Sequence, residues 1–391
     1  MPFTVGLSQH IDPGIAVGEV VGRVLDRLGP SPDIALLFTS GEHARATEKI
    51  AATITELLDP TAFIGTTACS VAAGEREIED DTAVVLWAGT LGFGNGPRAR
   101  AVRLAGVPDP GSDDEALAAA FSDVVATGDH SLILLADPFS FPVDAALTHW
   151  ADRWPQVSVL GGMASAAPMP GGNRVVVDGS VHSDGAAALV VGGSATVTHL
   201  VSQGCRPIGQ PYIITSAEGN IVRALGGKPP FERLQRTFSQ LEPADQSLVQ
   251  RGLHVGRVTD ERKIEFERGD FLIRGVLGAD RSTGAMAIGD EAPIGATVQF
   301  HVRDARTADQ DLRAALEEST TAQGALLFTC NGRGTHLFDT AHHDAAILSE
   351  RACAEVGGMF CAGEIGPVGP RSYVHGFTAS MALFADCDDA P

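Results

Sequence analysis

Short apolar runs and longer segments of helical periodicity alternate along the chain, and the same succession occurs three times. In each repeat an apolar run ends in turn residues, a helical pattern follows, and a second apolar run ends in a glycine-containing loop. A short apolar run bounded by turn residues is typical of a buried strand. The first runs are Ile34–Phe38, Leu132–Leu135 and Ala325–Thr329, and the second runs are Phe63–Thr67, Val157–Leu160 and Met359–Cys361.

The pattern predicts three strand–loop–helix–strand–loop repeats, each followed by a third strand. The third strands are expected at Ala83–Trp87, Ala186–Val191 and Phe377–Phe384. The loops are unevenly spaced, so this is a repeated architecture and not a sequence period, although any α/β protein shows some such rhythm. The expected fold class is α/β with α+β character: two domains built from these units, with mixed sheets. The domain boundary is placed near Ser216.

Other segments complete this outline. Stop and cap signals predict helices at Ile15–Leu28, Glu115–Val125, Phe231–Leu241, Pro243–Arg251 and Asp309–Thr320. Strands are expected at Val255–Arg257, Phe271–Leu277 and Thr297–Arg303. The glycine-rich stretch Gly89–Gly96 resembles a dinucleotide fingerprint, but Pro97 and a strand-like run follow where a helix should begin. It is therefore interpreted as a hairpin or loop.

Charge and composition exclude several classes of partner. The 391 residues include 28 basic and 49 acidic side chains, a net charge of −21. Nucleic acid and anionic membrane surfaces both require clustered Lys and Arg, so neither is expected as a partner. No apolar run approaches the ~20 residues of a membrane span, and the amino terminus does not resemble a signal peptide. Six scattered cysteines without a CxxC pair indicate no disulfide framework or zinc ribbon. A soluble, cytoplasmic protein is expected.

The glycine loops after the predicted strands carry the candidate ligand-binding side chains. Ligands gather outside the carboxyl ends of strands in such folds. Arg206, Asn331, Arg333 and Glu364 lie on these loops. A planar arginine matches a carboxylate, and Glu364 could take an ammonium group, so the pair would suit a zwitterion. For the arginines the alternative is a charged turn residue in solvent, and for Glu364 it is an internal salt bridge.

Cysteine and histidine chemistry stays open at this point. Cys330 follows a strand directly, and His336 or His375 could act as its base, although a free cysteine is commonly a small buried hydrophobe. A non-covalent haem would need one histidine ligand. The candidates are His149, His199, His336, His342, His343 and His375. The adjacent pair His342 and His343 would point about 100° apart on a helix and could not both face one iron.

Several ordered motifs resemble the FIST family, a bacterial sensory module made of a FIST N and a FIST C domain. The matching stretches are LGGMAS (Leu160–Ser165), GCRPIGQPYIIT (Gly204–Thr215), NIVRALGGKPP (Asn220–Pro230), CNGRGTHLF (Cys330–Phe338), GEIGPVG (Gly363–Gly369) and HGFTAS (His375–Ser380). The resemblance implies a FIST N-like domain at 28–215 and a FIST C-like domain at 216–380. It also implies binding of a small ligand, with amino acids as the proposed class.

The resemblance carries expectations about partners and cofactors. Family members are often joined to histidine kinase or cyclic-dinucleotide signalling domains, and some resemble haem-based nitric oxide sensors. No stretch of this chain is left for an output domain, so a partner kinase or other signalling protein is expected to carry the message. The cofactor is left open, with haem not favoured and no metal expected.

Three classes of function follow: a small-ligand sensor, a haem-based gas sensor, and a Cys-dependent hydrolase or lyase. The first is preferred, without catalytic residues. We expect both domains to build one ligand site. Its predicted residues are Gly162, Met163, Ser165, Arg206, Cys330, Asn331, Arg333, Glu364 and His375.

Overall fold

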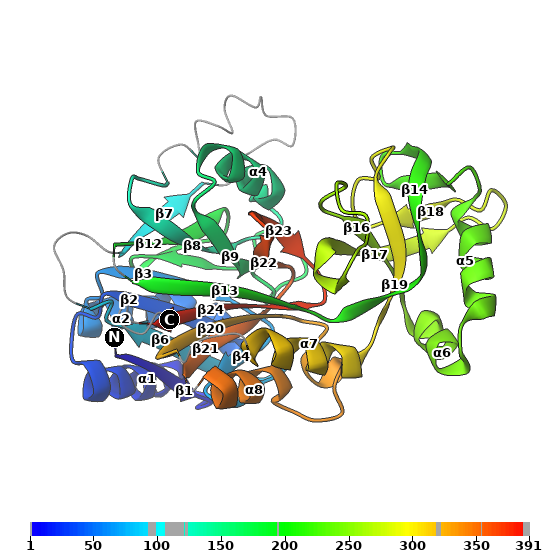
Figure 1. Cartoon of the computed structure of the whole chain (residues 1–391). Helices are drawn as coiled ribbons and strands as arrows, with labels where there is room; N and C mark the ends of the chain where they lie inside the picture. Colours follow the sequence, from blue (N-terminus) through cyan, green and yellow to red (C-terminus); the bar gives the residue numbers. More distant parts are fainter. Residues whose placement is uncertain are drawn as a thin grey trace. The chain divides into compact units, whose positions relative to one another are not determined.

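The computed structural model of the chain describes residues 2–92, 99–105, 121, 124–193, 195–317, 322–352 and 354–385 (Figure 1). Its contacts divide the chain into two compact units. The main unit comprises residues 1–201, 312–374 and 378–391, and the barrel unit comprises residues 202–311 and 375–377. The barrel unit is therefore an insertion into the main unit, and both units are discontinuous in sequence.

Repeat 1 of the main unit is a sheet with two helices on one face. Its elements are β1 (Phe3–Ser8), α1 (Pro13–Leu28), β2 (Ile34–Ser40), η1 (Gly41–Ala46), α2 (Thr47–Leu58), β3 (Ala62–Thr67), β4 (Val71–Ala73), β5 (Arg76–Ile78) and β6 (Ala83–Gly89). Strand β2 pairs in parallel with β3 and antiparallel with β6, and β1 extends the sheet beyond β6. Helix α1 begins at an Asp12 cap, whose carboxylate accepts from the backbone N–H groups of Gly14 and Ile15.

Repeats 2 and 3 have the same strand order. Repeat 2 contains β7 (Ala99–Leu104), β8 (Asp129–Ala136), α4 (Val143–Arg153), β9 (Ser158–Met163), β10 (Val175–Val177), β11 (Ser180–His182) and β12 (Ala186–Gly192). Repeat 3 contains β13 (Thr196–Gln203), α7 (Ala305–Glu317), β20 (Gly324–Cys330), η3 (Gly334–His336), α8 (His343–Ala352), β21 (Glu355–Cys361), β22 (Glu364–Val368), β23 (Arg371–His375) and β24 (Thr378–Ala385). In both, the first strand pairs in parallel with the second and antiparallel with the third.

The short hairpin between the second and third strands of each repeat completes the sheet of another repeat. Hairpin β4–β5 of repeat 1 pairs with β21 of repeat 3, and β22–β23 of repeat 3 pairs with β9 of repeat 2. Hairpin β10–β11 of repeat 2 pairs with β3 of repeat 1 and closes the cycle. Each of the three sheets of the main unit therefore has six strands, and the two strands at one edge come from a different repeat.

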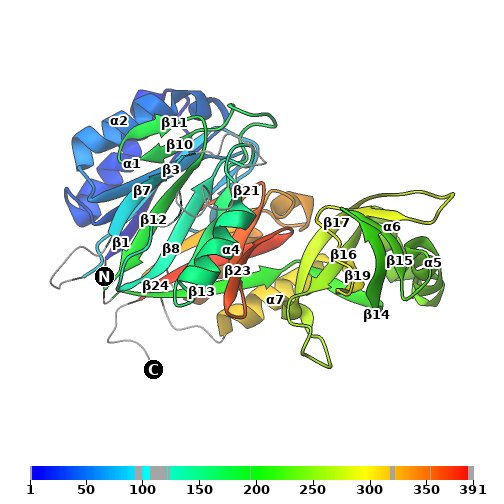
Figure 2. The ribbon, with the colours of Figure 1, turned by 90° about the horizontal axis from the view of Figure 1, so that it is seen from above.

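The three sheets share one core on their inner faces. Phe38, Leu135 and Phe328, at equivalent positions of the three first strands, belong to the same buried cluster. The alternate residues of these strands face separate outer cores. Helices α1 and α2 cover the outer face of repeat 1 (Figure 2), α4 packs on repeat 2, and α7 and α8 cover repeat 3. Because both faces are covered, these strands appear as continuous apolar runs.

The barrel unit is a closed antiparallel barrel of the strand order β14-β15-β18-β17-β16-β19 (Figure 1). The strands are β14 (Cys205–Glu218), β15 (Ile221–Leu225), β16 (Leu253–Val258), β17 (Phe271–Ala279), β18 (Met286–Ile288) and β19 (Thr297–Arg303). Helices α5 (Pro230–Gln240) and α6 (Pro243–Arg251) follow β15, and η2 (Arg268–Asp270) precedes β17. The interior is apolar, with Ile214, Met286 and Phe300 among its buried side chains.

The structure confirms the predicted fold class and the three-repeat organisation. It also shows that the predicted helix at Asp309–Thr320 begins earlier, at Ala305, where the preceding Asp304 accepts from Arg306 and Thr307. The expectations for Glu115–Val125 and Gly89–Gly96 fall largely outside the described residues. The boundary near Ser216 stays a prediction. Both compact units contain more than one segment of the chain, so they do not correspond to two consecutive domains separated at one residue.

Candidate functional site

The second strands of the three repeats end at one point of the main unit, where Ser165 joins them. The Ser165 hydroxyl accepts from the Cys69 backbone N–H at 3.0 Å and donates to the Phe360 carbonyl at 2.6 Å. The Ser165 N–H donates to the Thr67 carbonyl at 3.3 Å. Ser165 of repeat 2 is therefore bonded to repeats 1 and 3 at once.

Gly162 is closely packed at the same junction. It lies opposite Glu364 in the β9–β22 pairing, and a Cβ atom placed on it would lie 2.2 Å from the Cys361 sulfur. Cys361 is in turn the register partner of Cys330 on β20. The absence of a side chain at Gly162 thus lets strands of repeats 2 and 3 approach closely.

Gly162→Ala is therefore expected to lower the free energy of unfolding by about 1–3 kcal/mol through overpacking. The matched control is Gly18→Ala in α1, where no atom lies within 4 Å of the added Cβ and helix propensity favours alanine by about 1 kcal/mol. Urea unfolding of both variants measures the difference. If the sulfur causes the clash, Cys361→Ala will reduce the cost of Gly162→Ala; an equal cost in both backgrounds would contradict this contact.

Arg333 is a fully buried cation held by Asp344. Its Nε and Nη2 atoms donate to the two carboxylate oxygens of Asp344 at 2.6 and 2.8 Å, and the side chains are 1% and 0% exposed. Phe338 lies against the guanidinium, 5.2 Å from its centre. Asp344 also accepts from the Thr329 hydroxyl and from the His343 ring. Although burial opposes ionisation, the Arg333 guanidinium holds the pKa of Asp344 well below its usual range.

The remaining nitrogen of Arg333, Nη1, has no hydrogen-bond partner among the described residues. Arg333 also interacts electrostatically with Cys330 and Glu364. The Cys330 thiol is 7% exposed and accepts the Gly332 N–H at 3.4 Å. Asn331 and Ala362, which follow the two strands, are exposed. The cluster consequently lies just beneath the protein surface.

Glu364 is fully buried, with Thr378 and the Cys330 thiol as its hydrogen-bond partners. Its Oε2 atom accepts from the backbone N–H and the hydroxyl of Thr378, at 3.0 and 2.9 Å. Oε1 has no hydrogen-bond partner assigned within the described part of the chain. Burial raises the pKa of Glu364 to about 8, against the opposing effects of Thr378, Cys330 and Arg333. At neutral pH Glu364 is therefore mostly a neutral acid and not the carboxylate that the sequence suggested.

A second buried acid reaches this region on the exchanged hairpin of repeat 1. Glu77 on β5 accepts from the Ala345 N–H at the start of α8, at 2.9 Å. Burial, with the nearby charge of Asp344, raises the pKa of Glu77 to about 8. The Glu77 N–H donates to His342, which had been considered as a haem ligand. Repeat 1 thereby contributes to the surroundings of the buried ion pair in repeat 3.

The equivalent strand ends of repeats 1 and 2 are fully hydrogen-bonded. In repeat 1, Thr39 and Thr47 share a hydroxyl hydrogen bond of 2.9 Å, which corresponds to the bond between Thr329 and Asp344 in repeat 3. In repeat 2, buried Asp137 accepts from Asn173 at 3.0 Å and from Ser140 at 2.6 Å. Among the described residues, none of these polar atoms is buried without a partner. At this strand end, the unpartnered atoms therefore belong to repeat 3, although Glu77 Oε2 of the repeat 1 hairpin is also buried without an assigned partner.

Seven of the nine predicted site residues gather at this junction. They are Gly162, Met163, Ser165, Cys330, Asn331, Arg333 and Glu364. Met163 joins repeat 3 through backbone hydrogen bonds with Ala362 and Gly363. Sequence reasoning missed Asp344, Thr378 and Cys361. Asp344 gave one usable signal, an acid in the first turn of a predicted helix, but nothing marked it as the partner of Arg333.

The other two predicted residues belong to the barrel unit. Arg206 donates from Nε to Asp304 at 2.9 Å and also pairs with Asp245, so its fork is used inside this unit. His375 is 3% exposed at the end of β23. A ligand role for both stays a prediction, as does a site shared between the two units.

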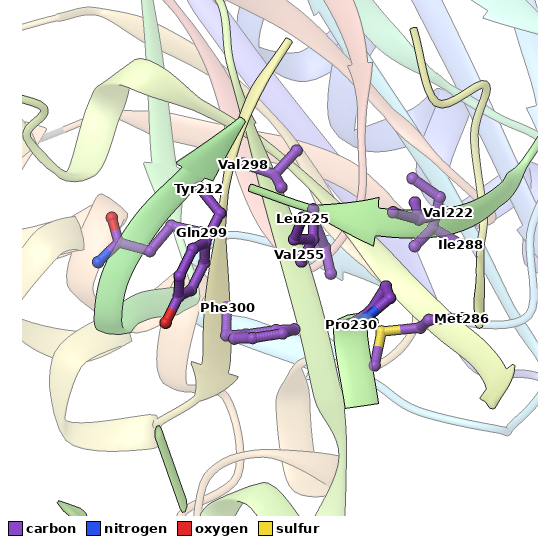
Figure 3. A pocket seen from close by; sticks show the side chains of 10 residues that line it. All are labelled: Tyr212, Val222, Leu225, Pro230, Val255, Met286, Ile288, Val298, Gln299 and Phe300. Carbon is purple, nitrogen blue, oxygen red and sulfur yellow. The ribbon is translucent and has the colours of Figure 1, made fainter. Parts of the chain in front are cut away.

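The barrel encloses a small apolar cavity (Figure 3). Tyr212, Val222, Met286 and Phe300 are among the side chains that line it. It measures about 10 Å³, which is about the space of one water molecule. No histidine lines it, so this cavity does not fit the haem site that the gas-sensor hypothesis requires. Within the described ranges, no group of three or more His, Cys, Asp and Glu is arranged to hold a metal ion.

One further feature bears on membranes. Of the helices that the structure describes, none combines the length and the apolar character needed to cross a bilayer.

Comparison with known proteins agrees with this architecture. The FIST N domain matches residues 33–228 and the FIST C domain matches residues 230–367. The chain belongs to the FIST family, whose members are small-ligand sensory domains. It is 40% identical to the uncharacterized protein Mb0898c of Mycobacterium bovis over 99% of both chains. It is also 40% identical to the uncharacterized protein Rv0628c of Mycobacterium tuberculosis, over 99% of this chain and 100% of that protein.

Proposed function

We propose that this protein is a sensor that binds a small polar metabolite, such as an amino acid or a related compound, at the junction in repeat 3. Arg333 and Glu364 would contact the ligand, with Cys330 beside them. Gly162, Met163, Ser165 and Asn331 would form the surrounding wall and rim. We further propose that a partner kinase or other signalling protein reads the bound state.

The observation that carries the proposal is the pair of unpartnered atoms, Nη1 of Arg333 and Oε1 of Glu364. Leaving a buried polar group unsatisfied costs about 1–3 kcal/mol. Repeats 1 and 2 build the same turn with satisfied hydrogen bonds, so the fold itself does not require this cost. A ligand or an ordered water that bonds to both atoms would remove it.

The junction also offers a physical route for signalling. A ligand beside Cys330 and Glu364 would lie next to strands β9, β21 and β22, which come from repeats 2 and 3. Ser165 extends these connections to repeat 1. A change at this point would therefore act on all three repeats of the main unit.

Thermal unfolding in the presence of amino acids and small carboxylic acids should identify ligands, because a ligand at 100 times its Kd stabilises the folded state by about 2.7 kcal/mol. Glu364→Met keeps the side-chain length and removes the polar atoms. We expect it to lower the affinity of each ligand at least tenfold, as measured by calorimetry.

The control is Asp137→Asn, at a buried acid that follows the first strand of repeat 2. It should leave ligand affinity unchanged even where it lowers stability, because Asp137 is satisfied by Asn173 and Ser140. If Glu364→Met destabilises the protein and leaves all affinities intact, Glu364 is a structural residue and the proposed site is wrong.

A further inference from the structure

The contacts of Arg333 and Glu364 determine which of their atoms can face a ligand. Two nitrogens of Arg333 are committed to Asp344, which leaves Nη1 and its N–H groups. Oε2 of Glu364 accepts from Thr378 twice, which leaves Oε1, and the Cys330 thiol also hydrogen-bonds to this carboxyl group. The available atoms are thus one N–H donor of a permanent cation and one oxygen of a buried acid.

The hydrogen bonds also locate the proton of neutral Glu364. Oε2 accepts the Thr378 N–H, which can only donate, so the acid proton belongs on Oε1. The titratable groups that act on Glu364 are Arg333 and Cys330. The charge of Glu364 in turn contributes to the raised pKa of Cys361. Burial is the largest effect and raises the pKa of Glu364 to about 8. At neutral pH the cluster therefore presents two donors, Nη1–H and Oε1–H.

We propose, building on the function proposed above, that the ligand group bound by Arg333 and Glu364 is a carboxylate, which accepts from Arg333 Nη1–H and from Glu364 Oε1–H. The ligand class is a small carboxylic acid in its anionic form. An ammonium group at this position would lie beside the Arg333 guanidinium, and two like charges repel strongly in a buried place. Asp344 already balances the charge of Arg333 through Nε and Nη2. The carboxylate is therefore held by the two donors, Nη1–H and Oε1–H.

This binding mode sets the sign of a proton linkage. A carboxylate bound by Oε1–H stabilises the protonated form of Glu364 and raises its pKa further in the complex. Affinity should therefore be constant near pH 6–7 and fall about tenfold per pH unit above pH ~8, with proton uptake on binding at pH 8–9. An ammonium group would require ionised Glu364, so affinity would rise towards pH 8 and protons would be released at pH 7.

The experiment uses the full chain with acetate, pyruvate, glycine and alanine as probes. Calorimetry at pH 7 and pH 8.5, in buffers with different ionisation enthalpies, measures both affinity and proton exchange. We expect acetate or pyruvate to bind with proton uptake at pH 8.5. Glu364→Gln offers an amide N–H in place of Oε1–H. Its affinity for the carboxylate probe should therefore stay within about threefold of the wild-type value, which is ~0.7 kcal/mol. The pH dependence of this affinity should disappear.

The outcomes separate the two proposals. Binding of the amino acids alone, with proton release and at least tenfold weakening by Glu364→Gln, would overturn the carboxylate assignment and leave the ligand site in place. Failure of every carboxylate probe to bind would also overturn it. If Glu364→Met does not weaken any probe that binds, the site itself is refuted and the carboxylate proposal falls with it.

Discussion

Asp344→Asn is expected to lower the free energy of unfolding by about 3–5 kcal/mol, because it leaves Arg333 buried without a counter-charge. Asn has one oxygen acceptor and no charge, and it cannot take both donors of the guanidinium fork. The side chain of Arg333 is 1% exposed and cannot reach water without local unfolding. Urea unfolding at pH 6 measures the loss.

Thr47→Val in repeat 1 is the matched control, because Thr47 in the first turn of α2 bonds to Thr39 as Asp344 in the first turn of α8 bonds to Thr329. Loss of this neutral hydrogen bond should cost only about 1 kcal/mol. Replacing both charged residues, Arg333→Met with Asp344→Leu, should recover most of the stability that Asp344→Asn loses. Equal costs for Asp344→Asn and Thr47→Val would contradict a buried ion pair in repeat 3.

Acidification from pH 6.5 to pH 4 should remove the contribution of three buried histidines to the free energy of unfolding. Burial lowers the pKa of His199, His254 and His301 to about 4. In the unfolded chain these groups bind a proton near pH 6.5. At these three groups the unfolded state therefore binds more protons throughout this window, so their contribution to stability is complete above pH ~6.5 and is lost as the pH approaches 4. Glu77 and Glu364, whose pKa values are raised to about 8, contribute with the opposite sign. A shift of about 2.5 pKa units corresponds to about 3 kcal/mol for each group.

His254 and His301 are cross-strand partners in the barrel and titrate together, so their contributions are not independent. His301→Gln should flatten the pH dependence of barrel unfolding, followed by circular dichroism in urea at pH 7 and pH 4.5. The exposed His10, replaced by Gln, is the control and should leave the slope unchanged. If His301→Gln keeps the wild-type slope, His301 does not contribute to the acid response.

Much of the candidate site was visible in the sequence because its residues follow strands. Cys330 ends the strand β20, Arg333 follows it, and Glu364 begins β22 after the next apolar run. Seven of the nine expected residues lie at one junction. The sequence did not show which side chains these residues bond to. The expected arginine clamp is already used by Asp344 in the main unit, and Arg206 is paired with two aspartates in the barrel. Pairings of this kind depend on side-chain directions in three dimensions, which a linear pattern does not contain.

The sequence by itself determined the local structure of this protein: three strand–helix–strand repeats with a third strand each, and the glycine loops that follow them. These features follow from periodicity and turn chemistry, which act between near neighbours in the chain. Only the tertiary structure decided the cyclic exchange of hairpins and the insertion of a barrel between β13 and α7. It also decided that the Arg333 and Glu364 side chains of repeat 3 are buried with one polar atom each unpartnered. These outcomes depend on contacts between segments far apart in sequence, such as β4 with β21. The local sequence of a short edge hairpin does not indicate which distant strand it pairs with.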